Sequence, residues 1–240
     1  MIGCDCATCR SSDPRDRRLR PSIYVETDDG IAVLVDAGPD LREQALTQAI
    51  RRVDAIVFTH GHADHILGMD DIRRFNVLQK RPMPCYGDER TIADIRQTFA
   101  YAFNPATQKG GGLPQIVMCT IAGAFSLGRQ EVVPVPLYHG ARPILGFRFG
   151  TFAYLTDCNR IPDESWALLG GLELVVIDAL RHRPHPTHFT LEEAIAVSRQ
   201  LGARRTLFTH MCHDLRHAET SARLPESMEL AYDGLVVECS

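Results

Sequence analysis

The chain has 240 residues, of which 45% are apolar, and it carries 26 basic and 30 acidic side chains for a net charge of −4. This length and apolar content can support one core, so we expect a single domain over residues 1–240. The charge balance gives no sign of a nucleic-acid-binding surface or a polybasic membrane anchor, and no apolar stretch approaches the roughly 20 residues that span a bilayer. The first residues lack the features of a signal peptide, and a cytoplasmic location is therefore expected.

Three of the eight cysteines fall within the first nine positions as a CxCxxC motif, formed by Cys4, Cys6 and Cys9. A disulfide framework belongs to short secreted chains with paired cysteines throughout, which this chain is not. Three thiolates at this spacing can occupy three corners of a tetrahedral zinc site, which then needs a fourth ligand. We expect an N-terminal zinc-binding loop over about residues 1–20, and three free surface thiols are the alternative.

Short runs rich in Val, Ile, Phe and Tyr, bounded by Gly, Asp or Pro, predict strands along the chain. They are Ser22–Thr27, Ile31–Ala37, Ala55–Thr59, Glu131–Tyr138, Leu145–Phe149, Thr151–Thr156, Leu172–Ile177, Arg205–Thr209 and Gly234–Glu238. Helical patterns lie between them at Pro39–Ile50, Asp88–Phe99, Asp163–Leu169 and Thr190–Leu201. The last helix begins at Thr190 with Glu193 three residues later, a capping box, and ends at Gly202. Strands mixed with helices predict two sheets that carry helices on their outer faces.

A long irregular segment is predicted over about Asn104–Pro114, where three glycines follow Lys109. Long loops in compact domains are often functional. The segment is therefore either a surface loop or a lid over a site.

The stretch FTHGHADH at Phe58–His65 holds three histidines and an aspartate within six residues. It leaves the carboxyl end of a predicted strand, where alternate side chains on extended backbone point the same way. Its candidate metal ligands are His60, His62, Asp64 and His65. Two pairs of such ligands are the minimum from which a dinuclear site can begin.

A metal ion needs further ligands, and the ends of later predicted strands supply them. His139, Asp157 and His210 each follow an apolar run directly. One histidine at a strand end is more often a hydrogen-bonded loop residue than a ligand. Several in order after HxHxDH favour a metal site.

These residues resemble the metallo-β-lactamase superfamily, whose motifs run HxHxDH, then His, then Asp, then His. The resemblance covers nearly the whole chain and implies an α/β fold, the four-layer αββα sandwich, with a pair of metal ions at one edge of the sheets. The ligands of the first ion would be His60, His62 and His139. Those of the second would be Asp64, His65 and His210, with Asp157 bridging the two ions.

Imidazole and carboxylate ligands suit Zn²⁺ and also Mn²⁺ or Fe. Two divalent ions about 3.5–4 Å apart would lower the pKa of a bridging water, present hydroxide at neutral pH, and neutralise a bound phosphate or carbonyl oxygen. Asp64, which would take part in catalysis as well as metal binding, and a bridging Asp157 fit the phosphodiesterase and thioesterase branches better than the β-lactamases. Asp36 resembles the acid that supports the ligands in this family, and a turn-forming aspartate is the alternative.

The late stretch FTHMCHDL offers His213 three residues after His210. A CxCxxC near the start with a late THxxH resembles the PhnP-type cyclic phosphodiesterases of phosphonate breakdown, which act on small anionic phosphodiesters. In that family the first histidine of the late motif serves the active site and the second completes a structural zinc. The resemblance therefore implies one structural Zn²⁺, and its ligands would be Cys4, Cys6, Cys9 and His213.

A general acid is needed for the leaving alkoxide, and the stretch HRPHPTHFTLEEA holds three histidines just after the predicted strand that runs into Asp178. His188 resembles the substrate-facing histidine of the family, and we expect it to be the proton donor or a phosphate ligand. Asp178 would orient it. His182 and His185 are expected to be loop residues.

The chain opens at Met1-Ile2-Gly3, whereas PhnP-like chains have a strand and a Gly-rich turn before the CxCxxC. We expect the sandwich to lack its first N-terminal strand; a start upstream of Met1 is the alternative, which the mass of the native protein would reveal. A missing strand exposes a sheet edge that invites pairing, so a homodimer is one expected state.

Three rival functions remain open. A PqqB-like protein of pyrroloquinoline quinone biosynthesis shares the fold and the CxCxxC zinc, but such proteins tend to lack the intact HxHxDH set. A nuclease of the RNase Z type shares the seven ligands but needs a basic arm for tRNA; the RDRRLR run at Arg15–Arg20 is short and is expected to be a solvated loop or a patch near the phosphate. A non-catalytic metal-binding module would not turn over bis(p-nitrophenyl) phosphate with added Mn²⁺ or Zn²⁺.

Overall fold

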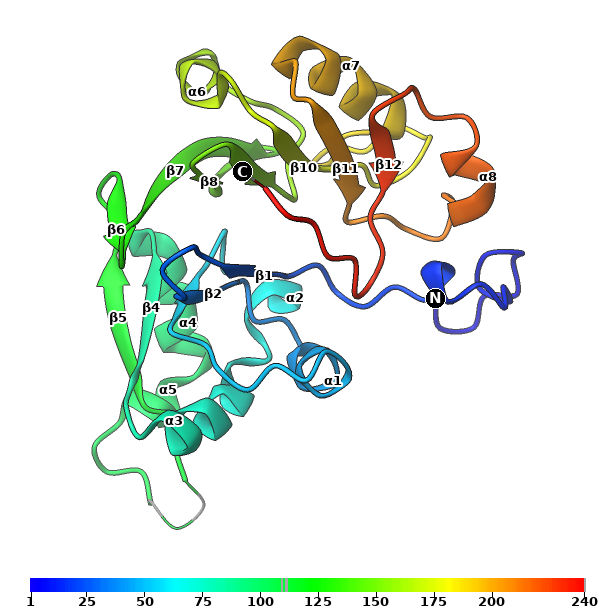
Figure 1. The fold of residues 1–240 in the computed structure, drawn as a ribbon. Coiled ribbons are helices and arrows are strands. Elements are labelled where there is room, and N and C mark those ends of the chain that lie inside the picture. The colour runs from blue at the N-terminus through cyan, green and yellow to red at the C-terminus, as the bar shows by residue number, and fades with distance from the viewer. Residues whose placement is uncertain (109, 111, 240) are drawn as a thin grey trace. The chain divides into compact units, whose positions relative to one another are not determined.

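The computed structural model describes residues 1–108, 110 and 112–239, and the chain divides into two compact units (Figure 1). The central unit is Arg20–Val132, and the terminal unit is Met1–Leu19 together with Val133–Ser240. The predicted glycine loop falls partly on positions 109 and 111, outside the described residues. None of the helices in the described part of the chain is long and apolar enough to cross a membrane.

The central unit is built on a mixed sheet whose strands run in the order β1-β2-β3-β4-β5. These strands are β1 (Ile23–Glu26), β2 (Ala32–Val35), β3 (Ala55–Val57), β4 (Met83–Gly87) and β5 (Ile116–Thr120). The unit also contains β6 (Phe125–Leu127), which pairs with β7 (Gln130–His139) in the second sheet. Its helices are α1 (Leu41–Thr47), α2 (Ala63–Ile66), the 3-10 helix η2 (Met69–Ile72), α3 (Arg73–Gln79), α4 (Glu89–Thr98) and α5 (Ala100–Phe103). Strands β2 to β5 are parallel, whereas β1 is antiparallel to β2.

The core of the central unit lies around β2 and β3, whose residues are all buried. Both strands are near-continuous apolar runs, as parallel strands covered on both faces require. Leu34 and Ile56 belong to one hydrophobic cluster with Met69, Ile72 and Phe75 from η2 and α3. This packing fixes the two strand ends from which the site is built.

The terminal unit carries most of a second mixed sheet, whose strands run in the order β12-β11-β10-β9-β8-β7-β6. Its strands are β7 (Gln130–His139), which begins in the central unit beside β6, then β8 (Arg142–Phe149), β9 (Phe152–Leu155), β10 (Leu174–Asp178), β11 (Arg205–Thr209) and β12 (Met228–Leu230). Its helices are the 3-10 helix η1 (Pro14–Asp16), α6 (Asp163–Trp166), the 3-10 helix η3 (Ala167–Leu169), α7 (Leu191–Leu201) and α8 (His217–Ser221). The strands β9 to β12 are parallel, and β8 is antiparallel to β9.

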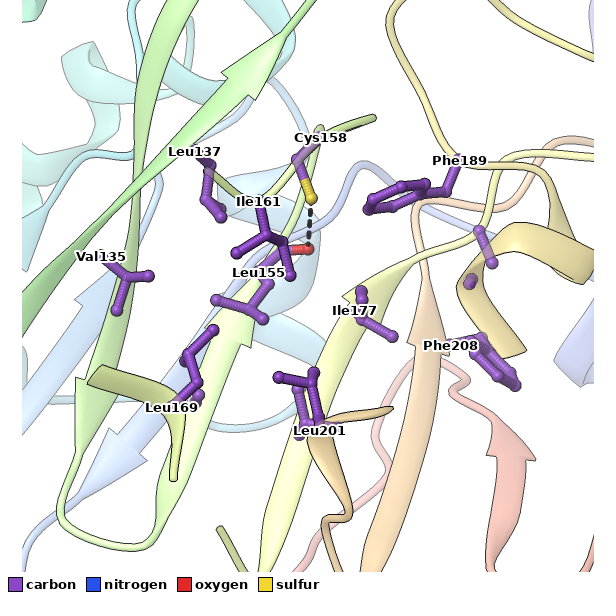
Figure 2. Packing of buried hydrophobic residues seen from close by; sticks show 14 of the residues in the cluster. Val135, Leu137, Leu155, Cys158, Ile161, Leu169, Ile177, Phe189, Leu201 and Phe208 are labelled. Carbon is purple, nitrogen blue, oxygen red and sulfur yellow. Dashed lines mark hydrogen bonds between the residues drawn. The ribbon is translucent and has the colours of Figure 1, made fainter. Parts of the chain in front are cut away.

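Figure 2 shows the core of the terminal unit, where Leu155, Ile177 and Phe208 come from three adjacent parallel strands. Phe189 and Leu201 add the loop before α7 and the end of that helix to the same cluster. This cluster anchors the parallel strands close to their carboxyl ends, which carry the polar residues of the site.

Helix α7 begins as predicted. The Thr190 side chain accepts a hydrogen bond from the backbone of Glu193, whose carboxylate accepts one from Thr190 N, and Gly202 ends the helix with φ +66°. The predicted strand Gly234–Glu238 is wrong: these residues form no strand, and the last strand in the described part of the chain is β12 at Met228–Leu230, which pairs with β11. Strands β4 and β5 were not predicted; Pro84 and Gly87 within β4 are residues that disfavour strands.

Candidate metal centres

In the central unit, parallel strands bring Asp36 and the HxHxDH loop to one sheet edge. Val35 of β2 pairs with Val57 of β3, and Asp36 N donates to Val57 O at 2.9 Å. The loop then continues through Thr59 to His60. Carboxyl ends of neighbouring parallel strands are the usual place for a site in such sheets.

The histidines of the loop lie against one another. The ring centroid of His60 lies 4.5 Å from that of His62 and 4.3 Å from that of His65. His62 is the N-cap of α2, so Asp64 and His65 fall in the first turn of this short helix. His60 and His65 are buried, and Asp64 is half-buried with Arg20 3.5 Å from its carboxylate.

The carboxylate of Asp36 is completely buried and joins the loop to β2. It accepts hydrogen bonds from Thr59 N and Thr59 Oγ1, both at 2.8 Å, and Nδ1 of His65 lies 2.7 Å from it. A carboxylate only accepts hydrogen bonds, so Nδ1 of His65 carries a proton that it donates to Asp36. Nε2 of His65 is then the nitrogen that can bind a metal, in the carboxylate–histidine arrangement common at zinc sites.

The Thr59 hydroxyl fixes the tautomer of His60 in the same way. The single hydroxyl proton of Thr59 is donated to Asp36, and Oγ1 lies 3.0 Å from Nδ1 of His60. Thr59 therefore accepts from a protonated Nδ1, which again leaves Nε2 as the ligand atom. One buried Asp–Thr pair thus sets the tautomers of two imidazoles of the HxHxDH motif.

In the terminal unit, four strands end in polar residues of the site. His139 ends β7, Asp157 follows β9, Asp178 ends β10 and His210 follows β11. Nδ1 of His139 donates to the backbone carbonyl of Asp157 at 2.7 Å, which leaves Nε2 as its ligand atom. Burial lowers the pKa of His139, and this favours the neutral imidazole that metals bind.

Asp157, His139 and His210 are close neighbours. Nε2 of His210 lies 2.9 Å from Oδ1 of Asp157, and Thr156 Oγ1 donates to the same oxygen at 3.1 Å. Ligand atoms of His139, Asp157 and His188 lie within 4.8 Å of one another, as do those of Asp178, His188 and His210. These clusters combine imidazole and carboxylate donors at distances that fit metal binding.

His188 is buried between the candidate ligands. Its ring centroid lies 4.7 Å from that of His139 and 4.8 Å from that of His210. The completely buried Asp178 lies 3.1 Å from Nδ1 of His188 and also accepts from Phe189 N at 3.1 Å. The carboxylate therefore places the His188 proton at Nδ1 and orients the ring.

Three candidate residues, one in the central unit and two in the terminal unit, have left-handed backbone, with φ of +64° at Asp36, +55° at Asp157 and +56° at His210. Such a conformation is uncommon outside glycine, although Asp and His tolerate it better than most residues. Strained residues of this kind cluster at functional sites, where the surrounding structure holds them in place.

The CxCxxC loop forms a second cluster with His213. Nδ1 of His213 lies 3.3 Å from Sγ of both Cys4 and Cys6 and 3.6 Å from Sγ of Cys9. A tetrahedral zinc with its usual bond lengths separates sulfur and nitrogen ligands by about 3.5 Å. The four donors therefore fit a structural Zn²⁺ within the terminal unit.

One thiol of this cluster, that of Cys6, favours the thiolate form. Cys9 N donates to Sγ of Cys6 at 3.4 Å, and this hydrogen bond together with His213 lowers the pKa of Cys6 to about 6. Since the thiolate is the form that binds zinc, a ligand of low pKa favours metal binding at neutral pH.

Arg18 and Asp16 tie the N-terminal loop to the segment that carries His213. Arg18 donates to the backbone carbonyls of Cys212 (2.8 Å) and Leu215, on either side of His213. The side chains of both Arg18 and Asp16 are largely buried, with 12% and 1% exposed, and Asp16 accepts from His217 N at 2.7 Å. The RDRRLR run was expected to be a solvated loop or a patch near the phosphate. Its Arg18 is instead largely buried and donates hydrogen bonds to two backbone carbonyls.

Some functional candidates were not found from the sequence. Thr59 and Arg18 act through hydrogen bonds to segments far away in the sequence, which no motif spacing reveals. The only sequence signal was that Thr59 stands directly before the HxHxDH motif.

A family model described as the beta-lactamase superfamily domain matches residues 32–211. The chain therefore belongs to the metallo-β-lactamase superfamily, with the α/β fold of two mixed sheets and flanking helices. Its His/Asp clusters and its Cys₃His cluster make it a metal-binding hydrolase of that fold.

Two solved structures and one further relative show which members of the superfamily this chain is similar to. The chain is 47% identical to a solved structure described as a new diphosphatase from the PhnP family, with a TM-score of 0.92, covering 100% of this chain and 92% of that one. Zn²⁺-bound PqqB from Methylobacterium extorquens shares the fold, at 20% identity and a TM-score of 0.75, over 99% of this chain and 95% of that one. An octanoyltransferase of Porphyromonas gingivalis is 36% identical over 98% of this chain, which spans 48% of that protein's length.

Proposed function

We propose that the protein is a metal-dependent hydrolase of small phosphate esters or anhydrides, of the PhnP type. The observation that carries this proposal is the likeness at 47% identity, over the whole chain, to a PhnP-family diphosphatase, in a chain that keeps the HxHxDH motif. Cyclic phosphodiesters and diphosphates both present a phosphorus atom to attack and an anionic oxygen to neutralise. A cyclic phosphodiester is the substrate expected from the motifs, and a diphosphate is the one that the relative suggests.

The proposed catalytic metals are two divalent cations, Zn²⁺ or Mn²⁺. Their proposed ligands are His60, His62, Asp64, His65, His139, Asp157 and His210, with Asp64 also taking part in catalysis. When bound, such a pair would activate water at neutral pH and neutralise charge on the substrate. Asp36 and Thr59 support this role, since they fix Nε2 of His60 and His65 as ligand atoms.

His188 is the proposed proton donor to the leaving oxygen. Asp178 holds Nδ1 at 3.1 Å, so Nε2 is the atom that would deliver the proton. The burial of both residues strengthens their interaction and orients the ring. Asp178 is thus a positioning residue rather than the acid itself.

The structural zinc, held by Cys4, Cys6, Cys9 and His213, is proposed to fasten the N-terminal loop to the segment after β11. His210 lies three residues before His213 on that segment. Loss of this zinc would therefore disturb a catalytic ligand as well as the fold.

The test is turnover of bis(p-nitrophenyl) phosphate, cyclic ribose phosphates and diphosphate esters by protein loaded with Mn²⁺ or Zn²⁺. Activity on at least one class is expected, and chelation of the metal should remove it. His62→Ala and Asp64→Ala should abolish turnover with the circular dichroism spectrum unchanged. No turnover of any class by metal-loaded protein would contradict the proposal.

A second candidate, acyl-thioester hydrolysis, is favoured by the octanoyltransferase relative. Acyl transfer is the named activity of the whole relative, of which this chain spans about half. Release of octanoate from an octanoyl thioester, measured beside the phosphoester panel, would distinguish the two candidates.

A further inference from the structure

His185 lies three residues before the proposed acid His188, in the HPTH turn formed by residues 185–188. Its sequence position favours an ordinary loop residue, but in the structure it contacts both Thr187 and His188. The ring is half-buried, with its centroid 4.9 Å from that of His188. The two imidazoles are therefore direct neighbours on the same turn.

The turn is fixed against the segment that carries His139. The side-chain amide of Asn159 donates to Pro186 O at 3.0 Å, and its oxygen accepts from Gly140 N at 2.9 Å. Gly140 has φ +63°, and a Cβ there would lie 2.8 Å from Cγ2 of Thr187. Only glycine allows this close approach, so the HPTH turn and the end of β7 are packed together.

The protonation of His185 follows from its hydrogen bonds. Thr187 N donates to Nδ1 of His185 at 3.3 Å, and Thr187 Oγ1 lies 3.2 Å from the same atom. A backbone N–H can only donate, so Nδ1 is an acceptor and Nε2 carries the proton. Partial burial and the neighbouring His188 and Arg181 lower the pKa of His185, which agrees with a neutral imidazole.

We propose that His185 is a second substrate-binding histidine, whose Nε2–H donates a hydrogen bond to an anionic phosphoryl oxygen beside His188. The proposal rests on the proposed hydrolysis of phosphate esters or anhydrides. The hydrogen bonds that His185 makes with the described residues all involve Nδ1, so the Nε2 donor is left to a ligand. The two histidines then have different roles. His188 transfers a proton, whereas His185 donates a hydrogen bond to the anionic phosphoryl oxygen in both the ground state and the transition state.

The chain offers a matched control in His182. It lies on the same loop, is exposed, and pairs with Glu192 at 2.8 Å instead of packing against His188. His185→Ala should raise KM roughly 10-fold, because a hydrogen bond to a charged group is lost, while kcat stays within about twofold. His185→Gln places an amide N–H near the position of Nε2 and should restore most of KM. His182→Ala should leave both constants unchanged, whereas His188→Ala should lower kcat.

The proposal is overturned if KM of His185→Ala equals that of His182→Ala, if His185→Gln restores nothing, or if His185→Ala loses metal by elemental analysis. If the wild type hydrolyses no phosphate ester or anhydride, the proposed function fails on its own account. Calorimetric binding of inorganic diphosphate to the Mn²⁺-loaded protein then tests His185 directly. Weaker binding by His185→Ala supports its role, and equal affinity refutes it.

Discussion

His213 and Cys6 are separated by 207 positions in the sequence, yet Nδ1 of one lies 3.3 Å from Sγ of the other. This contact belongs to the terminal unit and joins its two chain segments, Met1–Leu19 and Val133–Ser240. A metal at that point closes a very long loop, so its loss should affect stability as well as metal content.

Cys6→Ser should release about one zinc per chain and lower the melting temperature, because a structural zinc contributes folding free energy directly. Elemental analysis and thermal unfolding measure the two effects. Cys119→Ser is the control, since Cys119 lies on β5 of the central unit. Unchanged zinc content and stability in Cys6→Ser would refute the structural site.

Arg18→Gln should destabilise the protein by about 2–4 kcal/mol, since two backbone carbonyls lose their donor and Asp16 loses its buried partner. Faster loss of zinc to a chelator should accompany this change, because Arg18 fixes the backbone on either side of His213. Arg17→Gln removes an exposed arginine next to it and should alter neither quantity. Equal zinc release from the two variants would mean that Arg18 does not support the zinc site.

Asp36→Asn should lower the affinity for the catalytic metals by roughly 10- to 100-fold, the usual cost of removing a carboxylate behind a ligating histidine. Thr59→Val should weaken metal binding too, because His60 loses the acceptor that fixes its tautomer, whereas Thr59→Ser keeps the hydroxyl and should behave as wild type. Metal titration calorimetry measures the affinity. Nitrogen-15 chemical shifts of the histidine rings in metal-free protein report the tautomers, and unchanged shifts in Thr59→Val would contradict this assignment.

His217 should make stability depend on pH. It is buried, its Nε2 lies 3.3 Å from Leu230 O, and its Nδ1 has no hydrogen-bond partner among the described residues. Burial lowers the pKa of His217 below its ordinary value of 6.5. The unfolded chain therefore takes up the proton first, so this contribution to stability is complete above about pH 6.5 and is lost as the pH falls below it.

Denaturant unfolding of wild type and His217→Gln between pH 5 and pH 8 checks this expectation. The stability difference between the two proteins should shift in favour of the variant as the solution becomes more acidic. A difference that is the same at every pH would show that His217 does not titrate on unfolding.

The sequence was most informative where local chemistry decides the structure. Apolar runs predicted β2, β3 and β9 to β11, and polar residues directly after such runs marked His139, Asp157 and His210 as candidates. Membership of the superfamily and the two-sheet α/β fold agree with the structure and the comparisons. The roles of the individual site residues stay predictions.

What the sequence did not reveal depends on tertiary contacts. Arg18 resembled its exposed neighbours in RDRRLR, since nothing local shows that two carbonyls about 195 positions away will surround it. The segment Gly234–Glu238 is a short apolar run of the kind that predicts a strand, but such a run forms one only when it pairs with a neighbouring strand in the folded chain. The sequence does not distinguish His185 from an ordinary loop residue, because its contact with the Thr187 amide and the packing at Gly140 exist only in the folded chain.

The left-handed backbone at Asp36, Asp157 and His210 restricts which residues can replace them in evolution or redesign. A β-branched replacement such as valine or threonine would be strongly strained there, whereas Asn, Asp, His and Gly adopt this backbone most readily. Glycine would relieve the strain while deleting the ligand, so a Gly variant at Asp157 should be more heat-resistant than the Ala variant and equally inactive. Selection for thermostability alone would therefore favour the loss of Asp157, and only selection for turnover would retain it.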